Sequence, residues 1–261
     1  MRSDISPASL PDGAIPAATL VIMRPAANGG PDEILMVKRA TTMAFAAGAV
    51  VFPGGRVDPD DLVVAQLCGF EGEPAEGAAR VAALRETLEE TGLAVGWPAL
   101  DDAEIASVRE DLLAGVLLSD ILAQRGDRLS LDAMVPFARW CPNFKEARTF
   151  DTRFFAIVSP SHRHELTVEA AEHSHIFWAS ACETLEMADR GAVSVIFPTR
   201  RNLERLALAG DFSEFAAHAC DFPVELITPW IEDRDGTTHL CIPDHLGYPV
   251  TCEPFERVRR G

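Results

Sequence analysis

The chain is poor in basic residues and contains almost no lysine. Its 261 residues include 23 lysines and arginines against 40 aspartates and glutamates, a formal net charge of −17 at pH 7. Only Lys38 and Lys145 are lysines. A nucleic-acid-binding surface needs a basic footprint, so this balance argues against a nucleic-acid partner. Any polyphosphate ligand must instead be met by metal ions and a local group of arginines.

The sequence also lacks long apolar runs and closely paired cysteines. No stretch is long and apolar enough to cross a bilayer, so no membrane partner is expected. The N-terminal residues include Asp4 and Pro7 before any apolar run, so we expect no secretory signal. From residues 257–261 we expect neither a lipid anchor nor a peroxisomal address. The six cysteines form no C-x-x-C pair, so we expect no disulfide framework, reduced thiols and a cytoplasmic location.

A dense carboxylate cluster lies in segment 85–93, Arg-Glu-Thr-Leu-Glu-Glu-Thr-Gly-Leu. Glu86, Glu89 and Glu90 follow i, i+3, i+4 spacing, which places all three on one face of a helix. Like charges on one face repel unless a cation screens them, and oxygen ligands suit Mg²⁺ or Mn²⁺. The alternative is an ordinary solvated acidic helix face.

The same region has the features of a helix that ends at a glycine. Val81, Leu84 and Leu88 form an apolar stripe along it. Gly92 stands where a helix C-terminal glycine is expected. We therefore predict a helix over 78–91 that buries its apolar stripe and presents the carboxylates.

Upstream, the run Phe52-Pro53-Gly54-Gly55 contains two adjacent glycines. Without a Cβ, the backbone of such a turn can approach a ligand closely. Gly55 and segment 85–93 together resemble the signature of the Nudix hydrolases. That signature is Gly, five residues, Glu, seven residues, then Arg-Glu-apolar-any-Glu-Glu-any-Gly-apolar. The second half matches, with Thr87 in place of the usual aliphatic residue.

The first half of the signature is stretched in this chain. Positions 56–84, which are 29 residues, separate Gly55 from Arg85, where the family has 13. About 16 residues are therefore inserted, a length that suits a surface excursion. The residue eight positions before Arg85, where the pattern has Glu, is Gly77. Either Glu76 or Glu73 substitutes for it, or that role is absent.

The resemblance implies a role for each matching residue. Glu86, Glu89 and Glu90 would bind Mg²⁺ or Mn²⁺, and the Gly54 carbonyl would be a further ligand. Arg85, four residues before Glu89, would clamp that carboxylate in orientation and act with Glu89 and Glu90 in catalysis.

The general base varies among Nudix hydrolases and has several candidates here. Glu89 or Glu90 could take a proton from the attacking water. Glu169 and Glu172 lie in the later region where relatives often place such a carboxylate. Both are otherwise plain surface residues.

A longer segment, 35–55, is similar to the motif of coenzyme A diphosphatases within this family. Two positions depart from that motif: Ala40 replaces Ser and Ala46 replaces His. Stretches 139–140, 150–155 and 198–203 also look like this branch. The resemblance implies that coenzyme A or acyl-coenzyme A is the substrate. Arg39, Gly55 and Arg153 are then the candidate substrate-binding residues.

Two other functions remain open. The departures at Ala40 and Ala46 leave room for a pyrophosphatase acting on NADH, ADP-ribose or another nucleotide derivative. The missing carboxylate at Gly77 leaves room for a regulatory module that binds a nucleotide without hydrolysing it. Nudix relatives are often dimers, so a homodimer is a further expectation.

The fold class expected is α/β (α+β), a Nudix-type α/β/α sandwich with a mixed sheet and an additional helical insertion. We expect a loosely ordered segment 1–16 and a single domain over 17–261, with the box insertion at about 56–77 and an extra helical lobe at about 101–138. Expected strands cover 18–23, 33–38, 49–52, 148–158, 167–178 and 193–197, with a terminal hairpin over 225–231 and 237–242. Further helices are expected over 101–118, 130–137, 180–190 and 198–209.

Overall fold

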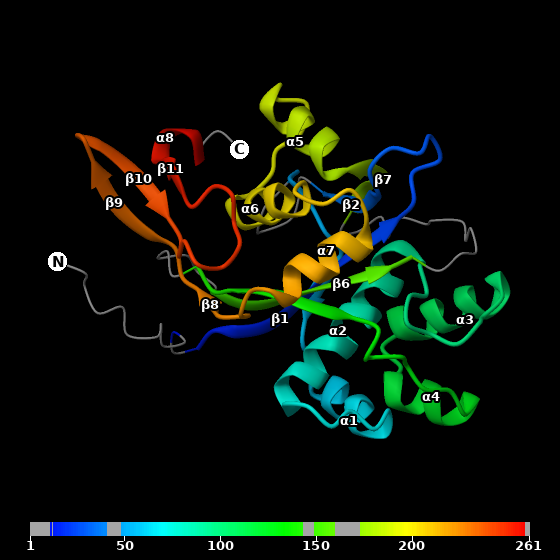
Figure 1. The fold of residues 1–261 in the computed structure, drawn as a ribbon. Coiled ribbons are helices and arrows are strands. Elements are labelled where there is room, and N and C mark those ends of the chain that lie inside the picture. The colour runs from blue at the N-terminus through cyan, green and yellow to red at the C-terminus, as the bar shows by residue number, and fades with distance from the viewer. Residues whose placement is uncertain (1–10, 12, 41–47, 143–148, 160–172, 259–261) are drawn as a thin grey trace.

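The computed structural model describes residues 11, 13–40, 48–142, 149–159 and 173–258. Within them, an eight-stranded mixed sheet lies between two layers of helices (Figure 1). The strands of this sheet are β1 Ile15–Arg24, β2 Glu33–Arg39, β3 Val50–Val51, β4 Gly54–Arg56, β5 Val135–Trp140, β6 Phe150–Val158, β7 His173–Ser180 and β8 Leu226–Ile227. A smaller sheet contains β9 Trp230–Arg234, β10 Thr237–Cys241 and β11 Cys252–Pro254. The helices are α1 Pro59–Leu67, α2 Pro74–Thr91, α3 Asp102–Leu113, α4 Leu118–Arg125, α5 Ala181–Asp189, α6 Phe197–Leu206, α7 Phe212–Cys220 and α8 Phe255–Val258.

Strand β1 is the centre of the large sheet. It runs parallel to β6 over its length, and its two ends pair antiparallel with β4 and β2. The sheet continues from β2 to β7 and from β6 through β5 to β8. A parallel β1–β6 pair needs a crossover, and the chain between them supplies α1 to α4. The mixed sheet and sandwich predicted from the sequence are confirmed.

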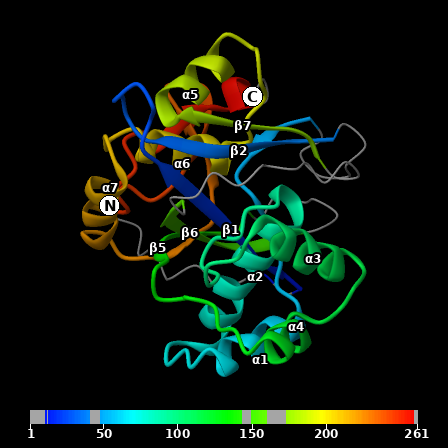
Figure 2. The ribbon, with the colours of Figure 1, turned by 90° about the vertical axis from the view of Figure 1, so that its right-hand side faces the viewer.

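Alternating side chains of β1 divide the core into two clusters. Leu20 and Ile22 pack in the cluster that contains α2 and its neighbours. Val21 and Met23 pack in the opposite cluster, which contains residues of α6 and α7. Helices α1 to α4 lie together on one side of the sheet, with α5 and α6 on the other (Figure 2). Because alternate side chains of β1 pack against α2, the helix lies on the sheet in contact with β1 and β4.

Several predicted elements are confirmed and two are wrong. The terminal hairpin is present as β9 and β10, joined by Asp235-Gly236, both with positive φ. The helix predicted over 130–137 is wrong, because Val135–Trp140 is strand β5. The strand predicted over 193–197 is wrong as well. Its only pairing within the described chain is one bridge, from Ser194 to Ala49, before α6 begins.

The cysteine prediction also needs correction. Cys241 and Cys252 form a disulfide between the neighbouring strands β10 and β11. The other four cysteines are free thiols, as predicted. No helix of the described residues is long and apolar enough to cross a membrane. Residues 1–10 and 12 lie outside the described residues, so loose order there stays a prediction, but the last two residues of the predicted segment 1–16 belong to β1.

Candidate active site

Helix α2 carries the carboxylate cluster and is fixed by its apolar face. Leu84 and Leu88 are fully buried in the α2-side core cluster. The helix begins at Pro74, four residues earlier than predicted, and closes at Gly92, whose φ of 71° is left-handed. The Gly92 N–H donates to the Leu88 carbonyl, as in a glycine C-cap. The last turns of α2, which carry Glu86 to Glu90, are therefore held firmly against the sheet.

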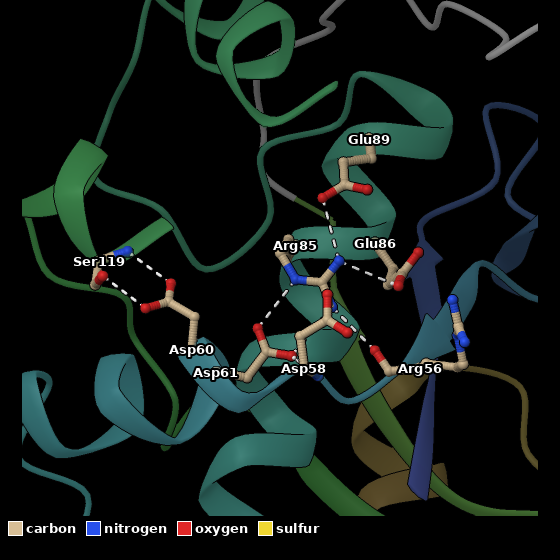
Figure 3. Close-up of polar contacts among 8 residues, drawn as sticks. All are labelled: Arg56, Asp58, Asp60, Asp61, Arg85, Glu86, Glu89 and Ser119. Carbon is tan, nitrogen blue, oxygen red and sulfur yellow. Dashed lines mark hydrogen bonds and ion pairs between the residues drawn. The ribbon is translucent and has the colours of Figure 1, made fainter. Parts of the chain in front are cut away.

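Arg85 is the centre of the site. Its side chain is almost buried, and four carboxylates lie within 3.6 Å of its nitrogens. Figure 3 shows Asp61, Glu86 and Glu89 reaching the guanidinium from three directions. Arg85 Nη1 donates to Glu86 Oε1 at 3.1 Å and to Glu89 Oε1 at 3.2 Å. The predicted contact between Arg85 and Glu89 is therefore present.

The sequence pointed to Asp58, Asp60 and Asp61 only as further metal ligands or loop-capping carboxylates, and the contact of Asp61 with Arg85 was not predicted. Asp61 is fully buried in the first turn of α1 and binds Arg85 through both oxygens, to Nε and Nη2, at 3.0 Å each. The same nitrogen Nη2 also donates to the Arg56 carbonyl at 2.9 Å. A bidentate pair of this kind fixes the plane of the guanidinium. Asp61 thus ties α1 to the carboxylate cluster of α2.

The sequence contained a signal for Asp61. Asp61 stands six positions after Gly55, so five residues separate the two, as in the family signature. The extra residues therefore lie between Asp61 and Arg85. The positions considered instead do other work. Glu76 binds Arg80 at 2.7 Å, and Gly77 packs where an added Cβ would meet the Phe70 ring.

The site holds more negative charge than one arginine balances. Burial raises the pKa of Asp61, and the hydrogen bond and charge of Arg85 offset only part of that rise. Burial raises the pKa of Glu86 to about 7 and also raises the pKa of Glu89, again with Arg85 opposing. Burial alone would lower the pKa of Arg85, but Asp61 and the neighbouring carboxylates raise it overall. A second cation near Glu86 and Glu89 would relieve this imbalance.

The two adjacent glycines fit closely around the cluster. The Gly54 N–H donates to Glu90 Oε2 at 3.0 Å, which joins β4 to the end of α2. Gly54 has a φ of 153°, and an added Cβ would overlap the Ala18 carbonyl oxygen. At Gly55, an added Cβ would fall on the carboxylate of Glu86. Glycine is required at both positions for the carboxylates to lie where they do.

Gly55→Ala is expected to displace the Glu86 carboxylate and weaken Mn²⁺ binding by roughly tenfold or more, as when a group that orients a metal ligand is lost. Isothermal titration calorimetry with Mn²⁺ measures this directly. Gly210→Ala is the matched control. Its new Cβ would also meet a glutamate oxygen, Glu214 Oε2 at 3.3 Å, but that glutamate is on α7 and not on α2. Equal Mn²⁺ affinity in Gly55→Ala and the unmodified chain would contradict this placement of Glu86.

The α2 carboxylates could hold a hard divalent cation. Glu86 and Glu89 each use only Oε1 toward Arg85, which leaves the second oxygen of each for a ligand. Burial without full compensation raises the pKa of Glu86 to about 7, and a nearby cation would favour its charged form. No group of three or more acidic, His or Cys side chains in the described ranges is already gathered for a metal. The oxygen donors suit Mg²⁺ or Mn²⁺, and the ligand set would be completed only on binding.

The other predicted residues lie in different places. Arg39 ends β2, and its buried Nε has no hydrogen-bond partner among the described residues. Arg153 of β6 binds Glu73, just before the start of α2, at 2.8 Å, beside a cavity of about 240 Å³. Across the sheet, Ala18 of β1 separates Arg153 from Gly55. The ion pair of Arg153 among the described residues is with Glu73, and its substrate role stays a prediction. Glu169 and Glu172 lie outside the described residues.

Comparisons with known proteins point to one family. A sequence model of the NUDIX domain matches residues 15–112, which include the whole carboxylate cluster. The crystal structure of a NUDIX hydrolase from Alicyclobacillus acidocaldarius is 30% identical in sequence, with a TM-score of 0.69, over 80% of this chain and 97% of that one. The curated protein "Putative nudix hydrolase 7" of Caenorhabditis elegans is 24% identical over 184 residues, 69% of this chain. The chain spans 57% of the length of that curated relative.

Proposed function

Because this chain belongs to the Nudix hydrolase family, we propose that it hydrolyses the diphosphate of a nucleotide derivative in a reaction dependent on Mg²⁺ or Mn²⁺. The proposed substrate is coenzyme A or an acyl-coenzyme A. The observation that carries the proposal is the set of carboxylates gathered on Arg85 beside Gly54 and Gly55. A pure binding module would gain nothing from this repulsive arrangement.

The proposed reaction is the attack of water on one phosphorus of the diphosphate. One P–O bond of the anhydride breaks, and adenosine 3′,5′-bisphosphate and the 4′-phosphopantetheine part are released. The physical problem is charge, because the attacking and leaving oxygens must both be stabilised beside an anionic group. When bound, the divalent cation supplies positive charge next to the diphosphate oxygens.

The residues of the chain would divide this task among them. Glu86, Glu89 and Glu90 would hold the cation, with the Gly54 carbonyl as a further ligand. The Gly54 N–H orients Glu90, and Arg85 orients Glu89 while Asp61 fixes Arg85. Glu89 or Glu90 would accept the proton that the attacking water loses.

Arg39 supports the choice of a phosphate-rich substrate. It lies at the end of β2, where its backbone N–H donates to the Ala49 carbonyl at 2.9 Å. Its buried Nε–H has no partner among the described residues, which costs free energy, and a phosphate oxygen would satisfy it. Arg39 stands inside segment 35–55, which resembles the coenzyme A diphosphatase motif. Gly55 would lie beside the substrate through its backbone, next to the Glu86 carboxylate that fills the space a Cβ would take.

A substrate panel tests the proposal. Coenzyme A, acetyl-coenzyme A, NADH and ADP-ribose are each incubated with Mg²⁺ or Mn²⁺, with and without a chelator, and the products are separated by chromatography. We expect chelator-sensitive release of adenosine 3′,5′-bisphosphate from coenzyme A. Cleavage of NADH or ADP-ribose alone would keep the diphosphatase and overturn the coenzyme A assignment. Tight binding without cleavage of any compound would indicate the regulatory module instead.

A further inference from the structure

Helices α3 and α4 form hydrogen bonds with the active-site region at two places. The first joins the start of α4 to the start of α1. The Ser119 N–H donates to Asp60 Oδ2 at 3.0 Å, and the Ser119 hydroxyl donates to Asp60 Oδ1 at 2.6 Å (Figure 3). Helices α3 and α4, residues 102–125, are called the lobe below. Both oxygens of Asp60 are therefore held by one residue of the lobe.

This first contact acts on the residue next to Asp60. Asp60 and Asp61 are consecutive in the first turn of α1. Ser119 holds Asp60 from one side, while Asp61 holds Arg85 from the other. A shift of this turn would move Asp61, and Asp61 fixes the plane of the Arg85 guanidinium. The lobe thus reaches Arg85 through two neighbouring carboxylates.

The second contact is at the end of α2. Arg109 of α3 donates from Nε to the Glu89 carbonyl at 2.9 Å. The last four carbonyls of a helix have no partner within it, and a cation at this end suits the helix dipole. Arg109 therefore fixes the backbone that carries the Glu89 carboxylate. The remainder of the lobe is anchored by apolar packing, since Val108 and Ile121 share the core cluster of α2.

We propose that Ser119 and Arg109 are positioning residues through which the helical lobe sets the geometry of Arg85 and Glu89. The catalytic meaning of this inference rests on the proposed function. The lobe holds the cluster from its two ends, at the first turn of α1 and at the last turn of α2. The described hydrogen bonds of Ser119 reach Asp60, and that of Arg109 reaches the Glu89 backbone, so the positioning acts through Asp60 and through that backbone.

Hydrogen exchange measured by mass spectrometry tests the positioning in the unliganded full chain. Ser119→Ala is expected to speed amide exchange in residues 57–64, and Arg109→Ala to speed it in residues 86–95. Ser119→Thr keeps the hydroxyl and should restore slow exchange. Calorimetric titration with Mn²⁺ gives a second readout, in which each alanine variant should raise the dissociation constant about tenfold.

Arg125→Ala is the matched control. The two ion pairs of Arg125 are with Glu104 and Asp127, and neither partner belongs to α1 or α2. This variant should alter neither segment nor the Mn²⁺ dissociation constant. The inference would be overturned if Ser119→Ala and Arg109→Ala showed the same amide exchange rates in both segments as Arg125→Ala and the unmodified chain. If the unmodified chain binds no Mn²⁺ and cleaves no compound, the proposed function fails, while the exchange rates still decide whether the lobe positions the cluster.

Discussion

Glu86→Gln and Glu90→Gln are each expected to abolish diphosphate hydrolysis while the chain remains folded. Glutamine keeps the shape of the side chain and removes the charge that a divalent cation needs. The loss of kcat should be on the order of 10²–10³-fold or more, as when one preorganised charge stabiliser is removed. Steady-state turnover of the substrate found in the panel measures it, and circular dichroism checks the fold.

Glu76→Gln is the control for these two substitutions. Glu76 lies on the same helix but binds Arg80, far from the cluster. This variant should keep most of its activity. Unchanged turnover in both Glu86→Gln and Glu90→Gln would rule out the metal assignment, whatever the substrate is.

Asp61→Asn is expected to destabilise the fold more than any other single charge removal at the site. Asp61 is fully buried, and its two oxygens accept from Arg85 Nε and Nη2. Asparagine has one acceptor oxygen in place of two, so one of the two buried hydrogen bonds from Arg85 is lost, which costs about 1–3 kcal/mol. For a chain of this size the loss lowers the melting temperature by roughly 5 °C. Urea unfolding followed by fluorescence measures the change.

Asp58→Asn is the matched control for Asp61→Asn. Asp58 also faces Arg85, but at 3.6 Å, and its side chain is 59% exposed. Exposed ion pairs contribute about 0–1 kcal/mol, and asparagine is equally suited to the N-cap position that Asp58 occupies. Similar losses of stability in the two variants would show that burial does not distinguish these carboxylates, and would contradict the role given to Asp61.

The sequence predicted the helical half of the site well because that half is local. Glu86 and Glu89 meet Arg85 because of their helical spacing, and Gly92 ends the helix at the predicted position. Predicting the role of Asp61 required knowing where in the signature the insertion lies. Counting back from Arg85 led to Gly77, whereas counting forward from Gly55 leads to Asp61.

The errors in the fold have physical reasons too. Strand β5 has a register shift between Pro136 and Ala138, which breaks the alternation that identifies a strand. Its partner β6 comes later in the chain, so the pairing is a tertiary choice. Helix α7 was not predicted, although Asp211 caps it by accepting from the Glu214 N–H. The Cys241–Cys252 pair depends on the pairing of β10 with β11, which cysteine spacing does not reveal.

Mn²⁺ binding, followed by electron paramagnetic resonance, tests the central claim most directly. The claim is that the carboxylates of α2 hold a divalent cation beside Arg85. The free Mn²⁺ signal is titrated with the unmodified chain and with the double variant Glu86→Gln/Glu90→Gln. The account predicts that the unmodified chain depletes the free signal and the double variant does not. Equal depletion by both proteins would place the cation elsewhere and contradict the account.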